Sequence, residues 1–473
     1  MDSPDRTTSL RTSQRLHRFG IVGLIVGCGW LYVRSPLKDP LLLGSGVGIV
    51  ILSAWPILEW ARHLRPWFPV FEIFMLTTIN FYALPLVGGH PAVFAFSDAV
   101  TWQAACGVLI FQSGALAGFT LNRWRPVAQS RLTEPLLPIR LLRHAQTGLW
   151  LNTLYLAVAS FTGLLGGQFE GTYRAIFFGI GIVALFLEFR RWGTGDIVRR
   201  DKIIIAANLT AQIILLFSGL YLLQGISFFI LAMIGYITAS RRVPIVVIVV
   251  AAGVLAVLHN GKSTMRSLYW EEGQSPPRFT ELPAFFVQWF ETGLASSQEE
   301  ASRNRSLTAN LSERAALFQM LCLVVDRVPS HEPYLYGESY VDIPAQVIPR
   351  FLWPDKPSSL GANVRLALYF GLVDEDSAKK VSIAFGPLAE SYANFGPAGL
   401  AILGAVIGLC FKFVSILSIG ASQLSTIGLF VILLTAWSFQ TEMVAATWLA
   451  SLFQASVVVL GIPLGFRIFF GSD

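Results

Sequence analysis

The sequence predicts an all-α, polytopic membrane protein with about twelve transmembrane helices and one long extracytoplasmic loop that carries short interfacial or re-entrant helices. Of the 473 residues, 54% are hydrophobic and only 14% are charged, whereas about a quarter of the residues in a typical soluble domain are charged. Apolar stretches of about twenty residues, the length that crosses a bilayer, recur along the chain. Basic residues gather in every second connection between those stretches. These observations exclude a soluble globular protein.

Each expected span is a mostly apolar run with few charges. The first run, beginning at Phe19, is expected to be retained, because no small-x-small cleavage pattern follows it. The expected spans lie near residues 19–33, 41–60, 68–88, 102–121, 147–166, 172–189, 203–222, 225–239, 243–259, 384–411, 424–438 and 445–466.

The basic connections set the expected orientation, because Lys and Arg in short loops are retained in the cytoplasm during insertion. Arginines crowd the N-terminal tail and each second connection after it, whereas residues 89–101, 167–171 and 223–224 contain no Lys or Arg. Arg34 and Lys38 in the first outer connection are the exception. Both termini are therefore expected in the cytoplasm, and residues 260–382 outside it.

Four regions follow from this topology: a basic cytoplasmic tail (residues 1–18), a transmembrane bundle (19–259), an extracytoplasmic loop or lid (260–382) and C-terminal transmembrane helices (383–473). The net charge of +6 lies mainly on cytoplasmic edges, where it would meet anionic lipid headgroups, so no nucleic-acid partner is expected. The four cysteines lie singly, with no CxxC pair or metal-ligand spacing. No cofactor and no metal site are expected.

The outer loop contains two apolar pieces, residues 282–290 and 315–325, that are too short to span and are expected to be interfacial or re-entrant helices. Asn310 and Glu313 have the spacing of a capping box at the start of the second piece. Arg314 then falls in the first helical turn, where the helix dipole disfavours a cation, so an anionic ligand would help to explain it. An ordinary solvated ion pair is the alternative.

Cations and aromatic residues are interleaved along this loop. A guanidinium group can bind two phosphate oxygens at once, and aromatic rings offer flat apolar faces to sugar rings. The mixture therefore suits a phosphorylated sugar lipid. Within residues 348–357, three prolines fix the backbone around Arg350 and Lys356. The stretch 385–399 leads into a span and places Glu390 near its outer end, where an ionisable side chain is costly unless it faces a polar cavity.

Residues 336–340 (Tyr-Gly-Glu-Ser-Tyr), 348–357 (Ile-Pro-Arg-Phe-Leu-Trp-Pro-Asp-Lys-Pro) and 385–399 together resemble the Wzy-type polymerases of bacterial surface polysaccharides, also described as O-antigen or oligosaccharide repeat unit polymerases. The resemblance extends loosely to residues 261–266. It implies a membrane glycosyltransferase of the C-type fold in the bacterial inner membrane. The donor and acceptor would be oligosaccharides on undecaprenyl diphosphate, with membrane lipids, a chain-length regulator and a flippase as further partners.

In the reaction that this resemblance implies, the acceptor hydroxyl attacks the donor's anomeric carbon while the lipid diphosphate leaves, so the protein must position both and stabilise negative charge. The predicted catalytic residues are Glu390, which would orient or deprotonate the acceptor, Arg350 and Arg314. The predicted diphosphate contacts are Lys262, Arg266, Arg314, Arg350, Lys356 and Arg365. The predicted glycan contacts are Tyr336, Tyr340, Trp353 and Tyr392. Metal independence is expected, because cationic side chains can take the place of a metal at the leaving group.

Three other functions fit the sequence less well. An O-antigen ligase would transfer the same glycan to the lipid A core, and the sequence barely separates it from a polymerase. A flippase or transporter would place charges near the bilayer midplane and often show two related halves, and the sequence has neither feature. A non-catalytic assembly subunit would tolerate alanine at Arg314, Arg350 and Glu390.

Overall fold

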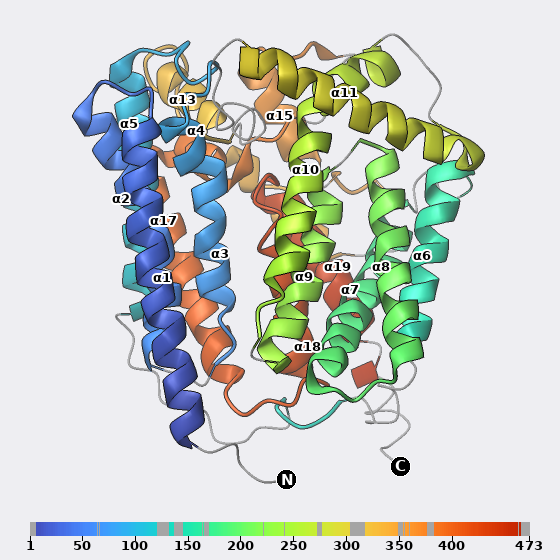
Figure 1. The fold of residues 1–473 in the computed structure, drawn as a ribbon. Coiled ribbons are helices and arrows are strands. Elements are labelled where there is room, and N and C mark those ends of the chain that lie inside the picture. Colours follow the sequence, from blue (N-terminus) through green and yellow to red (C-terminus); the bar gives the residue numbers. More distant parts are fainter. Residues whose placement is uncertain are drawn as a thin grey trace. The chain divides into compact units, whose positions relative to one another are not determined.

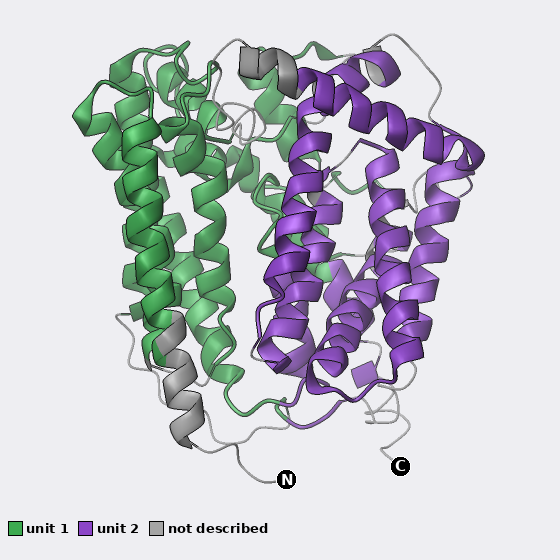
Figure 2. Ribbon diagram, viewed as in Figure 1, with its two compact units in different colours: residues 1–133, 311–421, 437–453 green, residues 134–310, 422–436, 454–473 purple. Residues whose placement is uncertain are grey.

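The computed structural model describes residues 6–63, 65, 67–120, 132–136, 145–162, 164, 170–220, 222–240, 242–271, 277–302, 317–348, 353, 355–358, 360–375, 383–461 and 463–464. The regular secondary structure of this described part is all helical, with no β-strand and only an isolated antiparallel bridge between Pro135 and Ser425. The predicted all-α class is therefore confirmed. The chain forms two compact units (Figure 2): unit 1 comprises residues 1–133, 311–421 and 437–453, and unit 2 comprises residues 134–310, 422–436 and 454–473.

Six helices in the described part of the chain are long and apolar enough to cross a membrane, which indicates a membrane-embedded protein. They are Pro40–Arg62, Val70–Val87, Asp98–Thr120, Arg199–Ser218, Ile245–Lys262 and Gly386–Leu417. The total of about twelve spans and the cytoplasmic placement of both termini stay predictions.

Unit 1 contains both long and short helices (Figure 1). Its elements are α1 (Arg6–Arg34), α2 (Pro40–His63), α3 (Val70–Thr78), the π-helical η1 (Ile79–Ala83), α4 (Leu84–Val87), α5 (Asp98–Thr120), α13 (Leu317–Arg327), η5 (Glu338–Tyr340), α14 (Ile343–Gln346), α15 (Gly361–Tyr369), α17 (Gly386–Leu417) and the first part of α19 (Ala445–Ser456).

The core of unit 1 is the close packing of α5 on α17. A Cβ atom on Gly404 would collide with the carbonyl oxygen of Phe111, and one on Gly408 would collide with that of Ala115. On the facing helix, a Cβ on Gly118 would collide with the carbonyl of Ala405. Small residues spaced four apart thus let the two backbones approach, which is a common way for helices to associate in a membrane.

The short elements of unit 1 lie around the start of α17. In Figure 1, α13 and α15 lie at the end of the unit where α4 ends and α5 begins. The start of α17 is at this end as well, and its helix is interrupted at Gly396, whose φ of 60° and ψ of −148° are not helical. Pro397 follows, and it removes a backbone donor just after the interruption. Glu390 lies on the short stretch of α17 before this kink.

Unit 2 contains the remaining described helices (Figure 1). They are α6 (Ala145–Phe161), α7 (Glu170–Thr194), α8 (Arg199–Ser218), α9 (Leu222–Ser240), α10 (Ile245–Arg266), the π-helical η3 (Ser267–Glu271), the 3₁₀ turn η4 (Phe279–Glu281), α11 (Leu282–Ser302), most of α18 (Thr426–Trp437), the end of α19, and the π-helical η6 (Val457–Gly461).

Two features of unit 2 differ from the sequence prediction. The boundary expected at residue 260 falls inside α10, which continues to Arg266, so Lys262 and Arg266 lie on a helix and not in a loop. The helix expected over residues 282–290 continues to Ser302, because the residues that follow include Leu, Ala, Gln and Glu, which are good helix formers. Figure 1 shows α11 lying across one end of α10, α8 and α6.

Buried polar side chains join helices inside each unit. In unit 1, Gln112 Nε2 on α5 donates to Ser53 Oγ on α2 and to Thr78 Oγ1 on α3, over 2.9 Å in both cases. In unit 2, Asn152 Nδ2 on α6 donates to Gln212 Oε1 on α8 over 3.0 Å. Bonds of this kind hold helices in register where the surroundings are apolar.

Candidate functional site

The predicted site residues divide between the two units. Lys262 and Arg266 belong to unit 2. Arg314 and Arg350 lie outside the described residues. The others, all in unit 1, are Tyr336, Tyr340, Trp353, Lys356, Arg365, Glu390 and Tyr392.

Glu390 is completely buried, and both of its carboxyl oxygens accept hydrogen bonds. Ser339 Oγ donates to Oε1 over 2.9 Å, and the backbone N–H of Ala445 donates to Oε2 over 2.7 Å. The carboxyl group therefore joins three parts of unit 1: η5, α17 and the start of α19. A general base must lie within reach of a substrate proton, whereas this carboxyl group is completely buried and hydrogen-bonded at both oxygens, so the geometry favours a positioning role for Glu390 over deprotonation of an acceptor.

Asn394, one turn after Glu390 on α17, extends this network to the backbone of the segment before η5. Its Nδ2 donates to Ser339 Oγ over 2.8 Å and to the Glu390 carbonyl over 2.7 Å, while its Oδ1 accepts from the Gly337 N–H over 2.8 Å. The Tyr336 N–H donates to the Asn394 carbonyl over 3.2 Å, and the Leu335 N–H to that of Ala393 over 3.0 Å. Residues 335–337 are thereby fixed against α17.

This network holds Tyr336 in an unusual conformation. Tyr336 has a φ of +46° and is followed by Gly337 with a φ of +97°. Left-handed backbone is ordinary for glycine but costs about 1–2 kcal/mol for a bulky L-residue. The Tyr336 side chain is nevertheless 75% exposed, so burial of its ring does not offset that cost. Strain of this kind persists where surrounding contacts impose it, and it is common at binding sites.

The other predicted glycan contacts differ in accessibility. Trp353 is 42% exposed, whereas Tyr392 on α17 is buried. Tyr340 is partly buried and stacks on Phe395, with ring centroids 6.5 Å apart and planes 28° from parallel. Burial and the nearby Glu390 carboxyl group both raise the pKa of the Tyr340 phenol above its usual value. Tyr336 and Trp353 are thus the better placed of the four to meet a ligand.

Lys356 and Arg365 are engaged within unit 1. Lys356 is buried, and its Nζ donates to the carbonyl oxygens of Ile348, Ala345 and Gln346 at 2.7, 3.4 and 3.5 Å. A cation beside the last carbonyls of α14 is favourable for the helix dipole and gives Lys356 a structural role. Arg365 Nη2 contacts Asp342 Oδ2 over 3.2 Å, and its Nη1 donates to the Glu338 carbonyl. Their predicted contact with a diphosphate would require these bonds to be replaced.

Lys262 has a different environment in unit 2. Its residue is only 3% exposed, and its Nζ has no hydrogen-bond partner among the described residues. An ammonium group that is removed from water without a compensating partner costs several kcal/mol. An ionisable residue in this position at the end of an apolar helix is therefore a candidate binding group for an anion.

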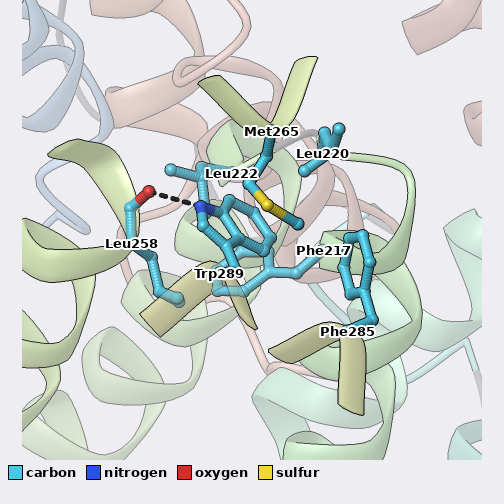
Figure 3. Packing of buried hydrophobic residues seen from close by; sticks show 7 residues of the cluster. All are labelled: Phe217, Leu220, Leu222, Leu258, Met265, Phe285 and Trp289. Carbon is cyan, nitrogen blue, oxygen red and sulfur yellow. Dashed lines mark hydrogen bonds between the residues drawn. The ribbon is translucent and has the colours of Figure 1, made fainter. Parts of the chain in front are cut away.

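The helix face that carries Lys262 also carries an apolar cluster (Figure 3). Leu258 and Met265 lie four residues before and three residues after Lys262, on the same face of α10. Both belong to a cluster that includes Trp289 of α11, whose Nε1 donates to the Leu258 carbonyl over 2.7 Å. The whole cluster is Phe217, Leu220, Leu222, Leu258, Met265, Phe285 and Trp289.

Arg266 lies one turn beyond Lys262 and binds the connection between α8 and α9. Its Nη2 donates to the Leu220 carbonyl over 3.2 Å. Leu220 has a φ of +59°, and it and Tyr336 are the two non-glycine residues with positive φ in the described chain. Predicted site residues therefore lie beside both strained residues. Arg266 binds Leu220, and the hydrogen-bond network of Glu390 holds Tyr336.

The two arrangements have different chemical capacities. In unit 2, Lys262 and Arg266 provide adjacent positive charge beside an apolar cluster, which suits an anionic group attached to an apolar chain. In unit 1, the segment from Tyr334 to Tyr340 offers aromatic faces on a backbone held by α17. The described residues include no group of His, Cys, Asp and Glu that could hold a metal ion.

Sequence reasoning did not assign roles to Ser339 and Asn394, which connect Glu390 to the Tyr336 segment. One signal was available, because Asn394 follows Glu390 by four residues and must share its helix face. The bond from Ser339 joins residues 51 positions apart and has no local sequence signature. The importance of Phe395, which stacks on Tyr340, was missed for the same reason.

Comparison with known proteins gives one match. No curated protein and no solved structure matches the chain. A family described as a domain of unknown function, DUF8712, matches residues 145–447, which include α6 to α18 and all of the described site residues. Because this match covers more than half of the chain, the protein belongs to the DUF8712 family.

Proposed function

We propose that this protein is a membrane glycosyltransferase that extends a bacterial surface polysaccharide, transferring a growing glycan from undecaprenyl diphosphate onto a new lipid-linked repeat unit. The observation that carries the proposal is the buried Lys262 ammonium, which has no hydrogen-bond partner among the described residues and lies one turn from Arg266. A lipid-linked diphosphate has the two properties that this place requires, namely negative charge and a long apolar tail.

The leaving group sets the main chemical demand of such a reaction. The acceptor hydroxyl oxygen forms a bond to the anomeric carbon, the bond from that carbon to the diphosphate oxygen breaks, and the hydroxyl proton is lost. Fixed cations at the diphosphate stabilise the negative charge that develops as it leaves. We assign this role to Lys262 and Arg266 of unit 2, while the roles of Arg314 and Arg350 stay predictions from the sequence. Glu390 acts as a positioning residue, since both of its oxygens are occupied.

The resemblance of residues 336–399 to Wzy-type polymerases supports the choice of substrate. In this proposal residues 336–375 and the start of α17 face the outer side of the bacterial inner membrane, where newly flipped repeat units arrive. The exposed Tyr336 and Trp353 side chains are the proposed glycan contacts.

The test uses purified full-length protein in nanodiscs with lipid-linked repeat units from cells that make the protein naturally. A polymerase builds a ladder of longer lipid-linked glycans from these units alone. Lys262→Met is expected to lower the yield at least 100-fold, because it removes a charge at the leaving group, which corresponds to about 2.7 kcal/mol. Lys262→Arg is expected to retain part of the activity.

Lys38→Met provides the matched control, because Lys38 is an exposed lysine in the connection between α1 and α2. Normal ladders are expected from it, and lost or shortened ladders from Arg350→Ala. Unextended repeat units from wild-type protein would contradict the proposal, and transfer that appears only after lipid A core is added would identify a ligase. Normal ladders from well-expressed Lys262→Met would remove the assignment of the diphosphate site.

A further inference from the structure

We propose that Tyr336 and its aromatic neighbours form a sugar-stacking surface that accepts neutral or amino sugars and rejects uronic acids. This surface consists of Tyr334, Tyr336, Tyr340 and Phe395 and is called the tyrosine platform below. The inference rests on the proposed function for its biological context, since it names the class of sugar that the enzyme would handle. Its physical argument depends only on unit 1.

The fold exposes the Tyr336 ring at a cost in conformational energy. The left-handed backbone of Tyr336 is strained, and its ring is 75% exposed. The Tyr336 ring contacts the Tyr334 ring edge to face, with the ring centroids 6.1 Å apart and the ring planes at 71° to each other. Packing on the described residues therefore does not explain why a large aromatic side chain occupies this position. A ligand that stacks on the ring does explain it.

Contacts with α17 hold the tyrosine platform rigid. Asn394 accepts the Gly337 N–H at its Oδ1 and the Tyr336 N–H at its carbonyl, and Ser339 is bonded to both Asn394 and Glu390. Phe395 lies beside Gly337, since a Cβ added there would be 3.4 Å from its Cζ. A fixed aromatic face loses little entropy when a sugar ring stacks on it, which favours binding.

Charged side chains lie around the tyrosine platform. The Glu338 side chain follows Tyr336 by two residues and is 62% exposed. Arg365 lies 4.0 Å from Glu338 Oε1 but is closer to Asp342, at 3.2 Å, so Asp342 already balances its charge. Glu332 precedes the platform. The described ionisable groups around Tyr336 thus carry an excess of negative charge.

The phenol of Tyr369 lies in the same negative field. Its hydroxyl donates to the Pro333 carbonyl, which places it beside the first residues of the platform. Burial raises the pKa of this phenol, and the carboxylates of Glu332 and Glu338 raise it further. The carboxylate of a uronic acid stacked on Tyr336 would lie near the carboxylates of Glu332 and Glu338, and these like charges would repel one another. A protonated amino group on the sugar would be attracted.

The test measures binding of soluble tetrasaccharides by saturation-transfer NMR, with full-length protein in nanodiscs or in a detergent without a sugar headgroup. The probes are cellotetraose, which is neutral, fully deacetylated chitotetraose, which carries amino groups, and tetragalacturonate, which is acidic. We expect the first two to bind at least tenfold more tightly than tetragalacturonate. Tyr336→Ala should weaken binding at least tenfold, Tyr336→Phe should retain it, and Glu338→Gln should narrow the discrimination against tetragalacturonate.

Tyr32→Ala is the matched control, because Tyr32 is another exposed tyrosine, on α1, that the platform does not include. Equal binding of all three probes, preference for tetragalacturonate, or unchanged binding by Tyr336→Ala would overturn the inference. Failure of the enzymatic proposal looks different. Glycan binding that depends on Tyr336, without any ladder formation, would support the tyrosine platform and contradict the polymerase proposal. Ladders that are unaffected by Tyr336→Ala would support the polymerase proposal and contradict the platform.

Discussion

Ser339 donates a hydrogen bond to Glu390 over 2.9 Å, and this bond connects the segment before α14 to the first turns of α17. The same carboxyl group accepts the Ala445 N–H at the start of α19. Glu390 is thus the point at which three separate parts of unit 1 meet. Its substitution should therefore affect folding as well as any activity that depends on the Tyr336 segment.

Glu390→Ala is expected to lower the free energy of unfolding by about 2–4 kcal/mol, because the Ser339 hydroxyl and the Ala445 N–H both lose their acceptor. Glu390→Gln keeps an acceptor for the Ala445 N–H and an amide that can contact Ser339 Oγ, so its loss should be about 1 kcal/mol. Thermal unfolding of the purified variants measures both effects. Equal destabilisation by the two substitutions would show that the hydrogen bonds are not what the carboxyl group contributes.

Lys262→Met is expected to make the ligand-free protein more stable. The substitution replaces a buried ammonium group that has no partner among the described residues with an apolar chain of similar length. Replacement of buried charge by well-packed apolar groups commonly stabilises a protein by about 1–4 kcal/mol. Unfolding of wild-type and Lys262→Met protein, both freed of lipid-linked glycan, checks the sign.

The matched variant is Lys38→Met, for which a change within about 0.5 kcal/mol is expected at an exposed site. A lower Tm for Lys262→Met than for wild type would mean that the ammonium group is satisfied inside the protein. That result would remove the physical reason for placing an anion there.

Lys356→Met should destabilise unit 1 without changing the affinity for an anion. The Lys356 ammonium donates to three carbonyl oxygens near the end of α14, and the variant leaves them without that donor. A loss of about 2 kcal/mol is expected, since bonds from a charged donor are stronger than neutral ones. Tm and binding of a soluble polyprenyl diphosphate analogue, measured on the same sample, separate the two effects. Weaker binding at unchanged Tm would restore Lys356 to the diphosphate site.

The helical class and the approximate positions of the long helices follow from sequence patterns, because apolar periodicity and length act locally. The hydrogen-bond partners of Lys356 could not be predicted in this way. The prolines around it predict a fixed backbone, yet the direction of its side chain depends on where α14 ends in space. The partners of Glu390 were equally inaccessible, since Ser339 and Ala445 are distant in the chain. The burial of Lys262 is a property of the assembled helices α8 to α11 and of no single segment.

Gly293→Ala is expected to disturb the crossing of α11 over α10. A Cβ at this position would collide with the carbonyl oxygen of Val257, and backbone atoms cannot move aside as a flexible side chain can. We expect a loss of at least about 2 kcal/mol in the free energy of unfolding. Gly253→Ala on α10 is the control, because its Cβ would have nothing within 4 Å. It should be neutral or stabilising by up to about 1 kcal/mol through helix propensity.

Tyr336→Asn should stabilise the protein while removing its proposed sugar contact. Asparagine tolerates the left-handed backbone that costs tyrosine about 1–2 kcal/mol, and the Tyr336 side chain is too exposed for its loss to offset that relief. A rise in the free energy of unfolding of about 0.5–1 kcal/mol is expected, together with weaker binding of cellotetraose. Tyr334→Asn, at a neighbouring tyrosine without positive φ, should not be stabilising. A fall in stability for Tyr336→Asn would mean that the ring makes a packing contribution to unit 1, and the case for a presented, ligand-facing side chain would then fail.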